Sequence, residues 1–219
     1  MDDKQAQPLI RAKVTNDFVD YPHNDLANAA WFFRERLTKA FESKEHSDGI
    51  FVDMMALVTM IAFALEGYAN FIGQRVIERQ TGKEKAQEVW AVFERKSVVC
   101  KIKAIKKMID IDIDWNKRPY STIGDLFELR NMFAHPKAHR AKEREKILVG
   151  TDGELKQMLR DFKPEYEQRL TWDFANAAYE DIDLIWNGLL KAAEIELHET
   201  WSGGLQGIEL IEVLNPQDN

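Results

Sequence analysis

The chain of 219 residues is long enough for one domain with additions, which is the simplest expectation. Its net charge of −7 excludes a protein that coats nucleic acid over its whole surface, so any polyanion site must be local. A hydrophobic content of 45% supports a buried core and a soluble globular protein. The single cysteine, Cys100, excludes an internal disulfide, and no secretory signal is visible, so we expect a cytoplasmic protein.

Apolar side chains recur at helical spacing along most of the chain, which predicts an all-α fold. We expect an irregular arm over residues 1–24, followed by a helix that Asn24 or Asp25 caps. A longer helix contains the apolar run from Met54 to Leu65. This run is shorter than the roughly 20 residues of a membrane span, so we expect the central helix of a bundle and no membrane contact.

The second half of the chain continues this pattern with further helices. Two are expected over about residues 84–96 and 97–109, followed by a loop, DIDIDWNKRPYST. The next helix begins at Ser121 or Thr122 and ends near His135, because Pro136 disfavours helical geometry in the residue before it. A last long helix runs from about residue 174 to 192. The prediction is a bundle of five to six helices over residues 25–202.

The end of the chain differs in pattern from the bundle. A tail over residues 203–219 follows a pair of glycines and contains the segment ELIEVL. That segment fits either a short strand or an arm on a partner subunit, and the residues do not decide between the two.

Three patterns in the sequence suggest a metal or phosphate site, but each lacks residues that such a site needs. Asp110, Asp112 and Asp114 have the first spacings of a calcium loop, but its glycine and closing glutamate are missing. Gly82 and the lysine after it suggest a phosphate-binding loop that lacks its leading glycine and its hydroxyl residue. His139 lies four residues after His135, but no third metal ligand is nearby, so no metal site is expected.

The segment LFELRNMFAHPKAH holds the clearest chemical pattern. Asn131 and His135 share a helix face at a spacing of four, so the amide can orient the imidazole, and Arg130 flanks them as a fixed cation. An arginine fork stabilises charge on phosphoryl oxygens while an imidazole moves protons near neutral pH. The three residues form a minimal apparatus for cleaving RNA through its 2′-hydroxyl, with no metal or cofactor.

The same residues also fit a purely structural role. Arg130 would then pair with a carboxylate in the core or at a helix end, and His135 would cap a helix C-terminus, where a cation is favoured.

Arg130-Asn131-x-x-x-His135, between an apolar helix and Pro136, resembles the R-x(4–6)-H motif of the HEPN superfamily. The segment ALEGYANFIG, which contains Glu66 and Asn70, is similar to the long second helix of bacterial HEPN-like proteins. The resemblance covers roughly residues 48–140, and its specific part is the arginine–histidine motif. It implies an all-α bundle that forms a homodimer and brings two motifs together at a cleft.

Carried over onto this chain, the resemblance gives each motif residue a role. Arg130 would stabilise the phosphate, His135 would be the acid/base group, and Asn131 is the polar residue that usually follows the arginine. Glu66 has the chemistry to support Arg130 across the bundle, but it equally fits a helix acid that faces solvent.

Basic residues are concentrated around the motif. Residues 95–146 have a net charge of +7, whereas the other 167 residues have a net charge of −14. This fits a phosphate backbone held beside the site, and it equally fits two solvated helix faces. Trp115 and Tyr120 would either stack on an unpaired base or anchor their loop on the bundle. The candidate substrate-binding residues are Lys107, Lys137, His139 and Arg140, and the same basic segment includes Lys101, Lys103 and Lys106.

The leading hypothesis is therefore a metal-independent HEPN endoribonuclease that acts on RNA, as a toxin or an antiviral effector. For a toxin, a neutralising antitoxin is a candidate partner, and the sequence does not reveal whether one exists. The alternative is a non-catalytic, dimeric HEPN-like module that binds RNA, a nucleotide or a protein.

Overall fold

The computed structural model describes residues 9–43, 49–136, 149–160 and 165–214. The chain divides into two compact units. One unit is the helical part, Pro22–Glu196, and the other joins the segment up to Tyr21 to the segment from Leu197 onward.

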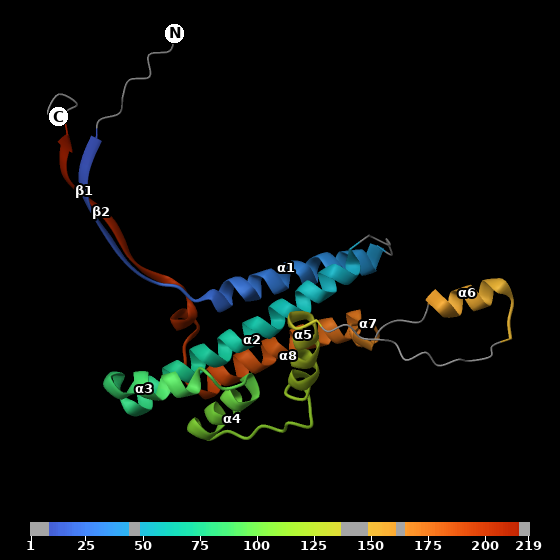
Figure 1. The fold of residues 1–219 in the computed structure, drawn as a ribbon. Coiled ribbons are helices and arrows are strands. Elements are labelled where there is room, and N and C mark those ends of the chain that lie inside the picture. The colour runs from blue at the N-terminus through green and yellow to red at the C-terminus, as the bar shows by residue number, and fades with distance from the viewer. Residues whose placement is uncertain (1–8, 44–48, 137–148, 161–164, 215–219) are drawn as a thin grey trace, which may run out of the picture. The chain divides into compact units, whose positions relative to one another are not determined.

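The helical unit confirms the expected all-α bundle (Figure 1). Five to six helices were expected, whereas the described residues form eight α-helices, because two short helices, α6 and α7, lie in the charged segment before the last long helix. The helices are α1 (Pro22–Ser43), α2 (Ile50–Thr81), α3 (Lys83–Phe93), α4 (Val98–Met108), α5 (Thr122–Ala134), α6 (Asp152–Arg160), α7 (Glu165–Arg169) and α8 (Trp172–Ala192).

Helix α2 is the central helix of the bundle. It packs against α1, α3, α4, α5 and α8, and it runs beside α8 for much of its length (Figure 1). By length and composition alone α2 could cross a membrane. Its contacts with five neighbouring helices place part of this apolar surface in the core, and 39% of its most apolar window is buried.

Local signals explain where the other helices begin and end. Ser97 caps α4 by accepting a hydrogen bond from the backbone N–H of Cys100 at 3.4 Å, and Thr171 caps α8 through Phe174 at 3.2 Å. Helix α1 starts before the expected caps, at Pro22, because proline fits the first turn of a helix, where its missing N–H is not needed. Helix α5 ends at Ala134, as its sequence predicts.

The second unit is built on a two-stranded antiparallel ribbon of β1 (Leu9–Val19) and β2 (Gly203–Leu214), with a short 3₁₀-helix, η1 (Leu197–Thr200), before β2. Leu9 lies opposite Leu214 and Val19 opposite Gly203, with one irregularity in register after Arg11. At the end of the ribbon, the backbone N–H of Tyr21 donates to the hydroxyl of Ser202 at 2.9 Å.

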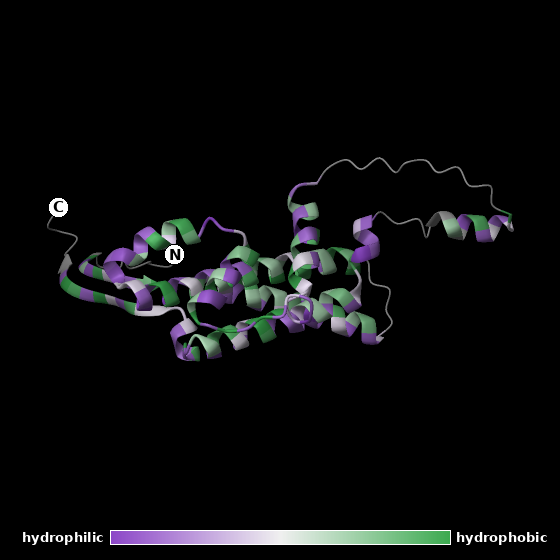
Figure 2. Ribbon diagram, turned by 90° about the horizontal axis from the view of Figure 1, so that it is seen from below, coloured by the Kyte–Doolittle hydropathy of each residue, from purple (hydrophilic) through white to green (hydrophobic). Residues whose placement is uncertain are grey.

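The irregular arm expected over residues 1–24 is therefore wrong for residues 9–19, which form a strand, and for residues 22–24, which begin α1. Of the two alternatives for the tail, the structure shows the strand. Hydrophobic and hydrophilic residues alternate along the ribbon in Figure 2, as expected for strands whose side chains point to opposite faces in turn.

Candidate functional site

Arg130 lies in the last turns of α5 and faces α2. Its Nη2 atom donates to Oε2 of Glu66 at 3.4 Å, and its Nη1 atom donates to Oδ1 of Asn131 at 2.9 Å. The Arg130 side chain is only 21% exposed. Of the two positions that the sequence leaves open for Glu66, the structure shows the one beside Arg130.

A second cation shares the Glu66 carboxylate. Lys101 of α4 donates from Nζ to Oε1 of Glu66 at 3.2 Å, and its side chain is 1% exposed. The cluster of Glu66, Lys101 and Arg130 thus joins three helices and contains two cations for one carboxylate. It also corrects the expectation for Lys101, which is a buried ion-pair partner and not part of a surface that holds a phosphate backbone.

Aromatic rings surround the guanidinium group of Arg130. Its Cζ atom lies 5.0 Å from the centre of the Phe63 ring and 5.8 Å from that of Phe127, within the range of a cation–π interaction. Among the described residues, the buried Nε atom has no hydrogen-bond partner. The guanidinium therefore keeps donor capacity that this arrangement does not use.

His135 stands just after the end of α5 and is exposed. Its backbone N–H donates to the backbone oxygen of Asn131 at 2.9 Å, which closes the last turn. Asn131 is also exposed, and its amide oxygen accepts from Arg130. The sequence predicts that the Asn131 amide orients the imidazole of His135. In the structure this amide instead binds the guanidinium of Arg130, and the imidazole lies at the surface one turn away.

The start of α5 is held by a buried carboxylate that the sequence analysis did not single out. Asp181 of α8 is 1% exposed and accepts from Nε of Arg118 at 2.8 and 3.0 Å. It also accepts from the hydroxyl of Thr122, the first residue of α5. A signal was present, because Asp181 stands at helical spacing between the buried residues Ala178 and Ile185, where an apolar side chain is expected.

The middle of α5 is fixed by α7. Arg169 donates from Nη2 to Glu128 at 2.8 Å and to Asp125 at 3.1 Å. The hydrogen bond from Arg169 lowers the pKa of Glu128, so this ion pair persists at neutral pH. Together with Asp181 and Glu66, these contacts attach the motif helix to three other helices.

The remaining candidates for substrate binding lie elsewhere or outside the described residues. Lys107 is on α4 and lines a cavity of about 440 Å³ with Lys103 and Lys106. Lys106 pairs with Asp112 at 3.2 Å, and Nζ of Lys103 lies 5.3 Å from the centre of the Trp115 ring. Three other predicted residues, Lys137, His139 and Arg140, lie outside the described residues.

Trp115 and Tyr120 pack on each other within the loop before α5. Their ring centres are 5.8 Å apart, and burial raises the pKa of the Tyr120 hydroxyl. Both rings are partly buried, which matches the loop-anchoring alternative better than a free stacking platform.

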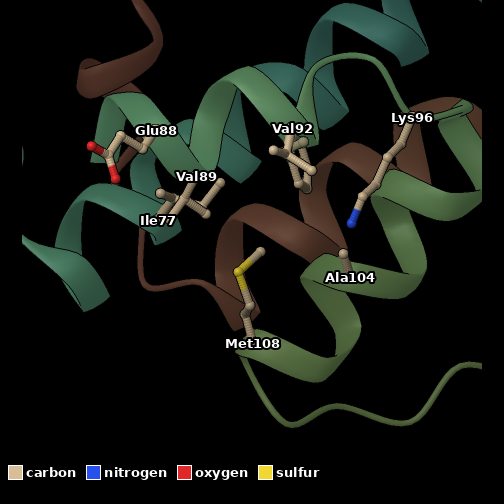
Figure 3. A pocket seen from close by; sticks show the side chains of 8 residues that line it. Ile77, Glu88, Val89, Val92, Lys96, Ala104 and Met108 are labelled. Atoms are coloured by element: carbon tan, nitrogen blue, oxygen red, sulfur yellow. The ribbon is translucent and has the colours of Figure 1, made fainter. Parts of the chain in front are cut away.

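The described residues also bear on a metal site and on a cavity away from the motif. No group of three or more His, Cys, Asp or Glu side chains suited to a metal ion gathers among the described residues. A cavity of about 420 Å³ lies between α2, α3 and α4 (Figure 3). Its lining is mostly apolar, with Glu88 and Lys96 as the two charged side chains, and it contains no residue of the motif.

No family model, curated protein or solved structure matches this chain.

Proposed function

We propose that the protein is a metal-independent endoribonuclease of the HEPN type, with Arg130, Asn131 and His135 as its catalytic residues. The proposal rests on one observation. The exposed imidazole of His135 and the guanidinium of Arg130, which belongs to a cluster with excess positive charge, both lie at the C-terminal end of α5. Two cations share the carboxylate of Glu66, so the cluster retains one positive charge with which to attract a phosphate.

The chemistry follows from these groups. A neutral imidazole of His135 takes the proton of the ribose 2′-hydroxyl, whose oxygen attacks the adjacent phosphorus. The bond from phosphorus to the 5′-oxygen breaks, and that oxygen gains a proton. The products are a cyclic phosphate and a 5′-hydroxyl end. The guanidinium of Arg130 stabilises the charge that develops on the phosphoryl oxygens.

This reaction favours a site built from two copies of the chain. Base and acid are needed at the same time, and one imidazole cannot be neutral for the first role and protonated for the second. A homodimer with two His135 side chains at one cleft provides both groups. The surface position of His135, one turn beyond the buried part of α5, is compatible with such a cleft.

The experiment measures cleavage of a single-stranded RNA by the purified full chain in EDTA, with the ends of the products identified. We expect a cyclic phosphate, and a rate that falls about 10²- to 10⁴-fold in His135→Ala and in Arg130→Ala. His198→Ala is the matched control, because His198 is exposed and lies in the other unit. A 2′-O-methylated RNA of the same sequence should stay intact, because its nucleophile is blocked. Equal cleavage by wild type and both motif variants would contradict the proposal.

One observation favours a second function without catalysis, a module that binds RNA or a nucleotide through residues other than Arg130. Arg130 is mostly buried and engaged by Glu66 and Asn131, as expected for a structural arginine. This function predicts salt-sensitive binding of RNA without turnover, and binding that His135→Ala leaves unchanged. Fluorescence anisotropy at several salt concentrations, run beside the cleavage assay, separates the two functions.

A further inference from the structure

Helix α6 has its own start signals. Thr151 and Glu154 form a capping box, in which the backbone N–H of Thr151 donates to Oε2 of Glu154 at 2.8 Å and the backbone N–H of Glu154 donates to the Thr151 hydroxyl at 3.4 Å. One turn further on, Lys156 pairs with Asp152 at 2.7 Å. The sequence therefore specifies this short helix locally, before any packing is considered.

The apolar residues of α6 lack a packing partner of matching size. Leu155, Met158 and Leu159 have the spacing of one helix face, and Met158 is 54% exposed. The pairs of helices that pack extensively on one another in the described bundle do not include α6. A helix of nine residues is marginally stable in water without tertiary packing, so an amphipathic one indicates a surface on which it docks.

The first half of α2 offers such a surface, called the α2 face here and made of Val52, Met55, Ala56 and Thr59. Their spacings of three, one and three place these residues on one side of the helix. Val52 is 64% exposed, and the other three are partly exposed. The Thr59 hydroxyl donates to the backbone oxygen of Met55 at 2.7 Å, so it needs no other partner. A contiguous apolar face of this kind on the central helix indicates that another segment covers it.

The chain holds α6 near the α2 face. Only residues 161–164 separate α6 from α7, so the last residue of α6 lies within about 18 Å of Glu165. Helix α7 is itself fixed beside the start of α2, because the rings of Tyr166 and Phe51 have centres 6.1 Å apart. The lengths also match, since α6 is about 13.5 Å long and the α2 face about 10.5 Å.

Charge sets the direction of docking. With its last residue held near Val52, α6 directs its first turn, which contains Asp152 and Glu154, towards Thr59 and the turn after it. That next turn carries Phe63, whose ring centre lies 5.0 Å from Cζ of Arg130. The cluster of Glu66, Lys101 and Arg130 has one excess positive charge, which favours an acidic turn beside it.

We propose that α6 docks on the α2 face of its own chain, antiparallel to α2. The docked helix covers the open apolar surface of the central helix and brings an acidic turn next to Arg130. The inference uses no catalytic role of the motif, so it is independent of the proposed ribonuclease activity.

The first test is disulfide formation in the full chain. Cys100→Ser removes the exposed cysteine, and Met158→Cys is then combined in turn with Val52→Cys and with Ala56→Cys, which lie one turn apart. We expect an intrachain disulfide in at least one of the two pairs, seen as faster migration of a single chain on a non-reducing gel. Lys156→Cys, on another side of α6, is the control, and its pairs should form at least about tenfold more slowly. No disulfide in either Met158 pair, equal rates for the control, or a disulfide that joins two chains overturns the proposal.

The second test needs no cysteine and decides the matter if those variants do not fold. Amide hydrogen exchange of residues 152–160 should be at least about 100-fold slower than in an unfolded chain, because the docked helix is protected. Val52→Lys should reduce this protection at least about tenfold. Val92→Lys is the matched control, because Val92 is 66% exposed on α3, and it should leave the protection unchanged. Protection below about tenfold in the wild type, or protection that Val52→Lys does not alter, contradicts docking on the α2 face.

Discussion

Lys101 and Arg130 approach the same carboxylate from different helices, one at each oxygen of Glu66. The Lys101 ammonium group is almost fully buried, so its charge depends on Glu66 for compensation. The guanidinium of Arg130 has other contacts, with Asn131 and two aromatic rings. Glu66 is therefore the residue on which the charge balance of the site depends.

Glu66→Gln should destabilise the fold by about 2–4 kcal/mol, because it leaves a buried lysine without a counter-charge. Lys101→Met should cost much less, because it removes the buried charge itself and fills a similar volume. Urea unfolding of both variants gives the two free energies. If Lys101→Met were less stable than Glu66→Gln, the buried ammonium group would not be the charge that destabilises this cluster.

Asp181→Ala should destabilise the bundle by about 2–3 kcal/mol, because it removes the buried acceptor of Arg118 and Thr122. Amide hydrogen exchange should increase most in the first turn of α5. Asp183→Ala is the control on the same helix, since Asp183 is exposed, and it should change the free energy of unfolding by less than about 0.5 kcal/mol. Equal effects of the two variants would argue against a specific role for Asp181.

Gly67→Ala should destabilise the packing of α1 on α2. A Cβ atom at Gly67 would lie 2.6 Å from Cβ of His23, too close without a shift of the backbone. We expect a loss of about 1–3 kcal/mol. Gly188→Ala on α8 is the matched change, because a Cβ there meets open space, and it should stabilise the fold by up to about 1 kcal/mol through helix propensity. Thermal melts of the two variants test whether Gly67→Ala lowers the melting temperature and Gly188→Ala raises it.

His23 should make the fold sensitive to mild acid. It is buried among Tyr68, Phe71 and Trp186, and burial lowers its pKa to about 4. In the unfolded chain the imidazole takes a proton near pH 6.5, so stability is retained above that pH and is lost as the pH falls from 6.5 towards 4.

The loss attributable to His23 between pH 7.5 and pH 5 should be about 2 kcal/mol. Urea unfolding at the two pH values measures it. His23→Leu should remove this part of the pH dependence, whereas His198→Leu, at an exposed position, should retain it. A wild type and a His23→Leu variant with the same slope would disprove the assignment.

Helices with local signals could be predicted closely from the sequence. Helix α5 begins at Thr122 and ends before His135 as expected, because its cap region and Pro136 lie within a few residues of its ends. The partners of the site could not be predicted in the same way. Lys101 meets Glu66 across 35 positions and Thr122 meets Asp181 across 59, and no local pattern specifies which helices will be neighbours.

The first strand shows a different limit. Ile10, Ala12 and Val14 alternate as strand residues do, but a single strand has no stability without a partner, and the partner of Val14 is Ile208. The alternation is readable from the sequence, whereas the pairing depends on two segments at opposite ends of the chain. The residues before α1 were for this reason interpreted as an irregular arm.

The pairing of Leu9 with Leu214 also has a consequence for the chain during its synthesis. Strand β1 leaves the ribosome before the helices of the bundle, and β2 leaves it after them. The helices can form from nearby residues as they emerge, but β1 has an unpaired edge and exposed apolar side chains until β2 has been made. A truncated product that lacks β2 would keep the edge of β1 unpaired, so this edge could aggregate or be bound by a chaperone. Strand β1 is therefore where a chaperone would recognise an incomplete chain.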